Sequence, residues 1–197
     1  MGTSAHGTAR DIARNAIRAR LTEVALDLFR RDGFDRVTVN DVAEAAGVSR
    51  STFLRYFGTK EEAVLSAADE HEAEVAQALR DRPAGEDDWT ALRQAFNPVL
   101  EHYRQDPASA LSMAKLIADT PALRARNLER QANLRPVLAG ILAERTGRPT
   151  ADSMSALVRS ASAIVCLSVA VDRWTVSDGD QDLNTLLDEA FAAITVA

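Results

Sequence analysis

The sequence has a single cysteine, Cys166, so no disulfide can form within the chain. This composition is typical of a protein in a reducing compartment. The first ten residues contain no apolar run of the kind that a secretory signal needs. The most apolar run, residues 161–171, is far shorter than the roughly 20 residues that span a bilayer. We therefore expect a cytoplasmic protein with no membrane partner.

The sequence also lacks a recognisable catalytic pattern. Neither His102 nor Cys166 has a second residue at the spacing that metal binding or nucleophilic catalysis needs. We expect no metal, no cofactor and no catalytic residue, which places a small all-α enzyme far behind other functions. Strand patterns and repeats are absent as well. Apolar residues make up 46% of the chain and charged residues 26%, as in soluble globular proteins.

Helical periodicity, in contrast, runs along almost the whole chain. Apolar residues recur three and four positions apart, and Ser, Thr, Asp and Pro stand at intervals typical of helix starts. The expected fold class is all-α. We predict nine helices, at about 8–33, 39–47, 50–56, 60–80, 88–104, 107–118, 121–146, 151–175 and 181–195, and a kink at Pro136.

Charge is distributed unevenly along the chain. The formal net charge is -6, yet residues 1–60 hold ten Arg or Lys and seven Asp or Glu, whereas residues 61–197 hold thirteen and twenty-two. A basic N-terminal part on an acidic body can bind a polyanion at one end while the other end repels it. Chance variation in charge would also produce so modest an excess.

Residues 39–57, VNDVAEAAGVSRSTFLRYF, have the spacing of a helix-turn-helix. Ala43 lets two helices cross closely, and Gly47 suits the sharp turn between them. The second helix of such a pair enters the DNA major groove by its N-terminal residues, here Arg50 and the two residues after it. Arginine can bind guanine O6 and N7 with two hydrogen bonds. The same spacing occurs in helix pairs that never touch DNA, so the pattern alone leaves both interpretations open.

Residues 10–65 closely resemble the DNA-binding domain of TetR-family transcriptional regulators. The resemblance rests on ALDLFRRDGFDRVTVNDVAEAAGVS followed by TFLRYFGTKEEAVL. It implies a homodimer whose N-terminal domains bind a pseudo-palindromic operator of double-stranded DNA while the C-terminal domain binds a small-molecule effector. The domains would span residues 8–58 and 59–197, connected by the helix at about 60–80.

The resemblance also implies which residues contact DNA. Leu54 departs from the family pattern, because the position often holds Tyr or Phe with a ring directed at a phosphate. The positive N-terminus of the helix that begins near residue 60 is expected to receive a phosphate. Arg55 either reaches DNA or is simply solvated. The DNA-binding residues that we predict are Thr38, Asn40, Arg50, Ser51, Thr52, Arg55, Tyr56 and Lys60.

More loosely, residues 116–142 and 174–187 are similar to a TetR subgroup with an acyl-CoA-like ligand domain. The similarity suggests a long apolar ligand. A cavity among the central helices would suit it, although a filled core fits the same apolar residues. Arg124, Arg126 and Arg130 could hold an anionic head group or be solvated. The predicted ligand-binding residues are Phe96, Leu100, Tyr103, Met113, Leu116, Ile117, Leu134 and Leu138.

The helix expected at 151–175 is apolar almost all round between Ala161 and Val171. Such a helix needs apolar neighbours on both sides, so we expect it to form a four-helix dimer interface with the last helix. The predicted interface residues are Val158, Val165, Leu183, Leu186, Leu187, Ala190 and Ile194. Together these features indicate a homodimeric repressor that an apolar or acyl-type ligand, such as an acyl-CoA or a lipid, releases from its operator. The alternative is a DNA-binding regulator without an effector.

Overall fold

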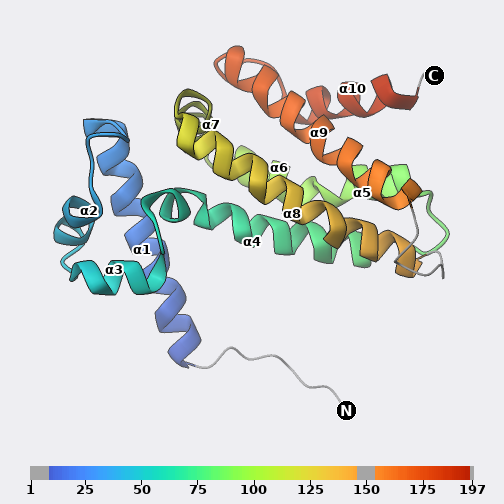
Figure 1. Cartoon of the computed structure of the whole chain (residues 1–197). Coiled ribbons are helices and arrows are strands. Elements are labelled where there is room, and N and C mark those ends of the chain that lie inside the picture. The colour runs from blue at the N-terminus through green and yellow to red at the C-terminus, as the bar shows by residue number, and fades with distance from the viewer. Residues whose placement is uncertain (1–8, 146–153, 196–197) are drawn as a thin grey trace. The chain divides into compact units, whose positions relative to one another are not determined.

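A computed structural model describes residues 9–145 and 154–195 of the chain (Figure 1). All the secondary structure in these residues is helical. The chain divides into two compact units, one ending at Ala67 and the other beginning at Ala68, so the boundary lies inside a helix. We call them the N-terminal unit and the C-terminal unit.

The N-terminal unit contains α1 (Ala9–Asp32), α2 (Val39–Ala45), α3 (Arg50–Tyr56) and the first part of α4 (Lys60–Arg80). Its core is aromatic. The rings of Phe29 and Phe34 lie 4.9 Å apart, and those of Phe53 and Phe57 lie 5.4 Å apart. All four side chains are buried. Because Phe53 lies on α3 and Phe57 ends it, this core fixes α3 relative to the other helices of the unit.

The C-terminal unit holds the rest of α4 and six further helices. Its single large apolar core includes Val75 and Leu79 of α4, Leu92 of α5, and Leu142 of α8. In this unit α9 packs against both α8 and α10. The six helices are α5 (Asp88–Ala95), α6 (Asn97–Gln105), α7 (Pro107–Asp119), α8 (Pro121–Arg145), α9 (Met154–Val176) and α10 (Leu183–Thr195).

The described residues form ten helices where the sequence predicts nine, because the segment 88–104 is divided in two. The first helix, α5, ends at Ala95, and Pro98 stands at the start of α6. Proline has no N–H to donate to the carbonyl four residues earlier, and its ring crowds that carbonyl. The break at Phe96 therefore follows from Pro98. Pro136, in contrast, lies inside α8 without ending it, and the kink expected there stays a prediction.

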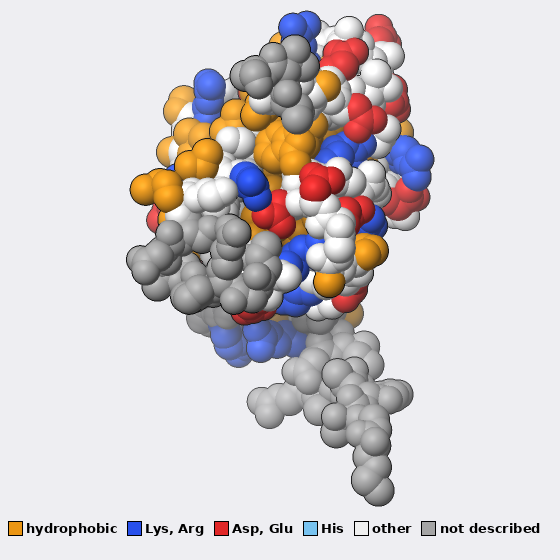
Figure 2. Space-filling model, turned by 90° about the vertical axis from the view of Figure 1, so that its right-hand side faces the viewer, with side chains coloured by type: hydrophobic (Ala, Val, Ile, Leu, Met, Phe, Trp, Pro, Cys, Tyr) orange, Lys and Arg blue, Asp and Glu red, His pale blue; other side chains and the backbone are white. Residues whose placement is uncertain are grey.

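One helix is longer and more apolar than the sequence run at 161–171 indicated, although helices of soluble proteins reach the same length and hydropathy. Among the described residues, α9 alone is long and apolar enough by length and composition, with a mean hydropathy of 1.8 in an 18-residue window of which 33% is buried. The sequence-based prediction counted only the run at 161–171, whereas further apolar residues on both sides of it raise the mean hydropathy of the whole helix. The face of the C-terminal unit shown in Figure 2 has exposed apolar side chains along one edge and charged ones along the other.

Candidate nucleic-acid interface

The start of α2 is fixed by the capping box that the sequence predicts. The Thr38 hydroxyl accepts from the Asp41 backbone N–H at 3.3 Å, and the Asp41 carboxylate accepts from the Thr38 backbone N–H at 2.7 Å. These bonds satisfy donors that the first turn of a helix leaves without partners. The hydrogen bonds from Thr38 also hold the pKa of Asp41 below its usual value. Thr38 is thus a structural cap whose side chain is exposed at the edge of the unit.

The turn between α2 and α3 depends on Gly47. Its φ of 68° lies in the left-handed region, which side chains other than glycine rarely adopt. After the turn, the Val48 backbone N–H donates to the carbonyl of Ala43 at 2.9 Å. Ala43 itself is buried, so the two helices pack closely at this point. The predicted helix-turn-helix is therefore present.

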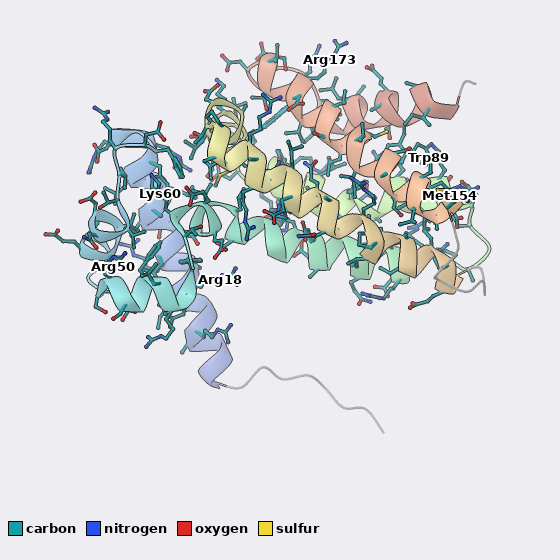
Figure 3. The ribbon with its side chains drawn as sticks, viewed as in Figure 1. Arg18, Arg50, Lys60, Trp89, Met154 and Arg173 are labelled. Atoms are coloured by element: carbon teal, nitrogen blue, oxygen red, sulfur yellow. The ribbon has the colours of Figure 1, made fainter. Side chains whose placement is uncertain are left out.

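The N-terminal end of α3 presents a guanidinium and several hydroxyls. The Ser49 hydroxyl caps the helix by accepting from the Thr52 backbone N–H at 3.1 Å. The same oxygen lies 2.9 Å from the Ser51 hydroxyl and 2.9 Å from the Thr52 hydroxyl. Arg50, labelled in Figure 3, is exposed and makes no hydrogen bond or ion pair in the part of the chain that the structure describes. Its five N–H donors are therefore available to a partner.

Three further predicted residues lie on α2 and α3. Asn40 is exposed in the first turn of α2. Arg55 is exposed on α3, and its guanidinium carbon lies 5.6 Å from the centre of the half-buried Tyr56 ring. The guanidinium thus stacks near an aromatic ring while keeping its outer donors accessible.

Lys60 has a different environment from the one that the resemblance implies. Its Nζ donates to the backbone carbonyls of Phe34 at 2.7 Å and Val37 at 3.1 Å, and it lies 4.2 Å from the centre of the Phe34 ring. The ammonium therefore ties the start of α4 to the loop between α1 and α2 (Figure 3). Two acidic residues, Glu61 and Glu62, also occupy the first turn of α4, and their charge opposes phosphate binding there.

Two contacts that sequence reasoning missed connect α1 to α4 and to the end of α3. The buried hydroxyls of Thr22 and Ser66 lie 2.8 Å apart, and Ser66 donates to the carbonyl of Ala63. The guanidinium carbon of Arg18 lies 5.6 Å from the centre of the Phe57 ring. Neither contact has a signal in the sequence, because the partners are far apart along the chain and belong to no recognisable motif.

The predicted ligand-binding residues occupy two kinds of environment. Four of them, from α5–α6 and α8, are buried in the core of the C-terminal unit. The Tyr103 ring packs against that core, with its centre 5.2 Å from that of Trp174. The residues from α7 are only half-buried. The four core residues are Phe96, Leu100, Leu134 and Leu138, and the three on α7 are Met113, Leu116 and Ile117.

The predicted dimer residues divide in a similar way. Val158 is 54% exposed and Val165 55% on α9, and Ile194 of α10 is also exposed. Leu183 and Leu187 are 7% and 0% exposed, because they pack into the core of their own unit. They have almost no surface left for a partner, and we remove them from the interface. Leu186 and Ala190 are half-buried, and sequence reasoning missed the exposed Met154 and Val169.

Two short helices that cross at a tight glycine turn, with a free arginine at the exposed end of the second, define a helix-turn-helix DNA-binding protein. Comparison with models of protein families identifies the family of this chain. Residues 21–67 match the model for bacterial regulatory proteins of the tetR family, and residues 86–196 match the model for the MftR C-terminal domain. The chain belongs to the TetR family and is a DNA-binding transcriptional regulator.

Individual relatives agree with this assignment. The chain is 32% identical over 178 residues to MftR of Mycobacterium tuberculosis, a proposed mycofactocin biosynthesis transcriptional regulator; the match covers 88% of this chain and 87% of MftR. It is 37% identical over 136 residues to the HTH-type transcriptional regulator TcmR of Streptomyces glaucescens, covering 66% of this chain and 60% of TcmR. The chain thus matches less than two thirds of the length of TcmR.

Solved structures share the fold across both units. FadR of Bacillus subtilis, in complex with stearoyl-CoA, has a TM-score of 0.63 at 17% identity, covering 90% of this chain and 97% of that one. The TetR-family repressor FadR of Thermus thermophilus, in complex with lauroyl-CoA, has a TM-score of 0.57 at 24% identity, covering 90% and 93%. At these identities the likeness shows a common fold.

Proposed function

We propose that this protein is a cytoplasmic, homodimeric repressor that binds a two-fold symmetric operator and is released from it by a small apolar or acyl-type ligand. The observation that carries the proposal is the free guanidinium of Arg50 at the exposed N-terminal end of α3. An arginine at this end of a recognition helix is placed to read guanine in the major groove. An enzyme would instead need a cluster of catalytic groups around a substrate.

The other exposed groups of α2 and α3 fit contacts to the DNA backbone. Asn40 and the hydroxyl of Ser51 lie near the two helix starts, where phosphates commonly bind. Arg55 and Tyr56 lie one turn further along α3. Thr38 is the last residue before α2, and its hydroxyl already serves the capping box, so its contact would be shared with Asp41.

The exposed face of α9 supports dimerisation with a second copy of the chain. Met154, Val158, Val165 and Val169 lie four, seven and four residues apart, so they form one stripe along the helix, and all of them are exposed. A row of exposed apolar side chains along one helix is typical of a surface that a partner covers, and Ile194 of α10 is exposed as well. A second copy fits best, because a two-fold contact between identical helices matches a two-fold symmetric operator.

The ligand part of the proposal rests on the FadR structures, which contain long acyl-CoA molecules, and on α7. None of the residues of α7 is buried, although the helix carries Met113, Leu116 and Ile117. An apolar ligand could cover these side chains. It would release DNA only if it bound the DNA-free conformation more tightly than the DNA-bound one.

A regulator without an effector is the second candidate. The burial of Phe96, Leu100, Leu134 and Leu138 favours it, because those side chains fill the region where a ligand was expected. A thermal-shift screen with acyl-CoA molecules and lipids separates the two candidates. A ligand-released repressor gains stability with at least one of them, whereas a regulator without an effector gains none.

Selection of bound DNA from a random pool tests the proposed function. The full-length protein should enrich an inverted repeat whose half-site centres lie about 34 Å apart, one turn of DNA, or a multiple of that distance. This spacing would show that two copies of α3 read the DNA together. Recovery of no common sequence, or of a single half-site without its symmetric copy, would contradict the proposal.

A further inference from the structure

A cluster of charged and titratable side chains lies where α4 enters the C-terminal unit. Its members come from three helices that are far apart in the sequence, and it takes no part in the DNA-reading surface. We call it the α4 cluster: His71, Glu72 and Glu74 of α4, His102 and Tyr103 of α6, and Arg130 of α8.

One ion pair and one histidine–carboxylate hydrogen bond connect α4 to the other helices. The Arg130 Nη1 lies 2.6 Å from the Glu72 Oε1, and both side chains are 22% exposed. The His102 Nε2 lies 2.8 Å from the Glu74 Oε2, with the side chains 39% and 43% exposed. The His71 ring stacks on the His102 ring at 4.2 Å between centres. The cluster is therefore partly shielded from water but open to a ligand from outside.

The cluster lies on α4 between the segments that anchor this helix in the two units. Immediately after it, Val75, Ala76 and Leu79 anchor α4 in the core of the C-terminal unit. Before it, Ala63 and Val64 of the same helix are buried in the N-terminal unit. The cluster thus joins to α6 and α8 the segment of α4 that directly follows the boundary between the two units. A change in the contacts of the cluster therefore acts on α4, the helix that joins the N-terminal unit to the C-terminal unit.

The cluster carries the donors that an anionic group needs. Arg130 donates from Nη1 to the Glu72 carboxylate and from Nη2 to the side-chain oxygen of Asn127. A guanidinium that gives up such acceptors can bind a carboxylate or a phosphate through two parallel N–H groups. The Tyr103 hydroxyl makes no hydrogen bond with the described residues. Burial raises the pKa of Tyr103, and the nearby Arg130 charge opposes the rise, so the hydroxyl keeps its proton at neutral pH. Tyr103 also packs against Trp174, which places apolar surface beside these donors.

We propose that Arg130 and the Tyr103 hydroxyl bind the anionic head group of the effector, a carboxylate or a phosphate, and that this group displaces Glu72 from Arg130. The displacement breaks the ion pair that holds α4 to α8 and so couples the ligand to the reading unit. The inference rests on the proposed function, because it names the ligand chemistry and the step by which the same repressor is released.

His71 adds a dependence on pH. Burial lowers its pKa, and the charges of His102 and Arg130 lower it further while Glu74 opposes them, so His71 is neutral in the free protein at pH 7. A bound anion stabilises the protonated ring and raises this pKa, so binding takes up a proton. Affinity for the anion should therefore increase as pH falls from 8 to 6, a range in which a carboxylate of pKa about 4.3 stays charged.

The test uses three probes with one chain length: dodecanoate, dodecyl phosphate and 1-dodecanol, each below the concentration at which it aggregates. Isothermal titration of the full-length protein should show at least one anion binding tenfold or more tightly than the alcohol. Comparison of the two anions separates a carboxylate ligand from a phosphate ligand. The preferred anion should also release the selected operator, whereas the alcohol should not.

Substituted variants then test which residues bind the anionic head group. Arg130→Gln should lose at least tenfold in affinity for the preferred anion, and Arg130→Lys should lose less. Arg126→Gln, which changes an exposed arginine of the same helix that pairs with Glu129, should bind as wild type does. Glu72→Gln should bind the anion several-fold more tightly, because the competing carboxylate is gone, and a purely structural role of Glu72 would not produce this gain. Melting curves establish that each variant is folded.

Equal binding of the alcohol and the anions, absence of anion binding, or wild-type affinity in folded Arg130→Gln would overturn the head-group assignment. Anion binding that leaves the operator bound would overturn the displacement of α4. Operator binding by the ligand-free wild type tests the proposed function independently of the anion site. Release by dodecanol alone would keep the ligand-released repressor and reject the anion site.

Discussion

At the scale of single residues, two basic side chains of the N-terminal unit have opposite roles. Arg50 is exposed and free to bind DNA, whereas Lys60 is committed to two backbone carbonyls within the unit. Both have the same charge, and both stand next to a predicted helix start. The difference lies in what surrounds them, because Lys60 faces the loop between α1 and α2 and Arg50 faces solvent.

Lys60→Met tests this difference. Hydrogen bonds to a charged group contribute about 1.5–3 kcal/mol when they are shielded from water, so the variant should lose about 2 kcal/mol of unfolding free energy. Thermal or urea unfolding measures the loss, with the exposed Arg55→Met as a control that should change little. An unchanged melting curve together with a tenfold weaker operator complex would show that Lys60 is a phosphate contact instead.

The sequence was sufficient to predict the helix-turn-helix, but it did not reveal the hydrogen bonds that Lys60 makes to backbone carbonyls. The turn at Gly47 and the caps at Thr38 and Ser49 involve residues within a few positions of one another, and local patterns reveal such contacts. The carbonyls that bind Lys60 lie 23 and 26 residues earlier in the chain. Their direction depends on how the loop after α1 folds, which no local pattern encodes.

At the scale of helices, periodicity predicts that a helix has an apolar stripe but not what covers it. On α10 the stripe holds two adjacent rows. One contains Leu183 and Leu187, which are buried in the unit's own core, and the other contains Leu186 and Ala190, which remain partly exposed. The packing of α10 on α9 and α5 distinguishes them. The same limit applies to α9, where only part of an almost wholly apolar surface is buried.

The exposed stripe of α9 leads to a prediction about assembly. Val165→Glu places a charge at the centre of the stripe, and burying that charge between two subunits costs more than the contact gains. The variant should therefore be monomeric by light scattering at concentrations where the wild type is a dimer. Leu128→Glu is the matched control, because Leu128 is 57% exposed on α8 and Val165 is 55% exposed. A Val165→Glu protein that stays dimeric would contradict the assigned interface.

At the scale of the whole molecule, the chain is an acidic protein whose excess of basic side chains lies in residues 1–60. The net charge of -6 would repel DNA if it were spread evenly, yet residues 1–60 carry more basic than acidic side chains. The helix α4 runs from one unit into the other and carries Lys60 and three members of the α4 cluster, His71, Glu72 and Glu74. The proposed ligand step therefore acts on a helix that belongs to both units.

The most direct measurement compares wild type and Arg50→Ala on the selected operator across a series of salt concentrations. The wild-type affinity should fall linearly with salt on logarithmic axes, as counterions are released from the phosphates. Arg50→Ala should weaken binding by about 1–3 kcal/mol, roughly 5- to 150-fold in Kd, and relax the base preference at one position of each half-site. Its melting temperature and dimer mass should not change. Salt-independent binding, or wild-type affinity and base preference in Arg50→Ala, would contradict the role of α3 as the element that reads DNA.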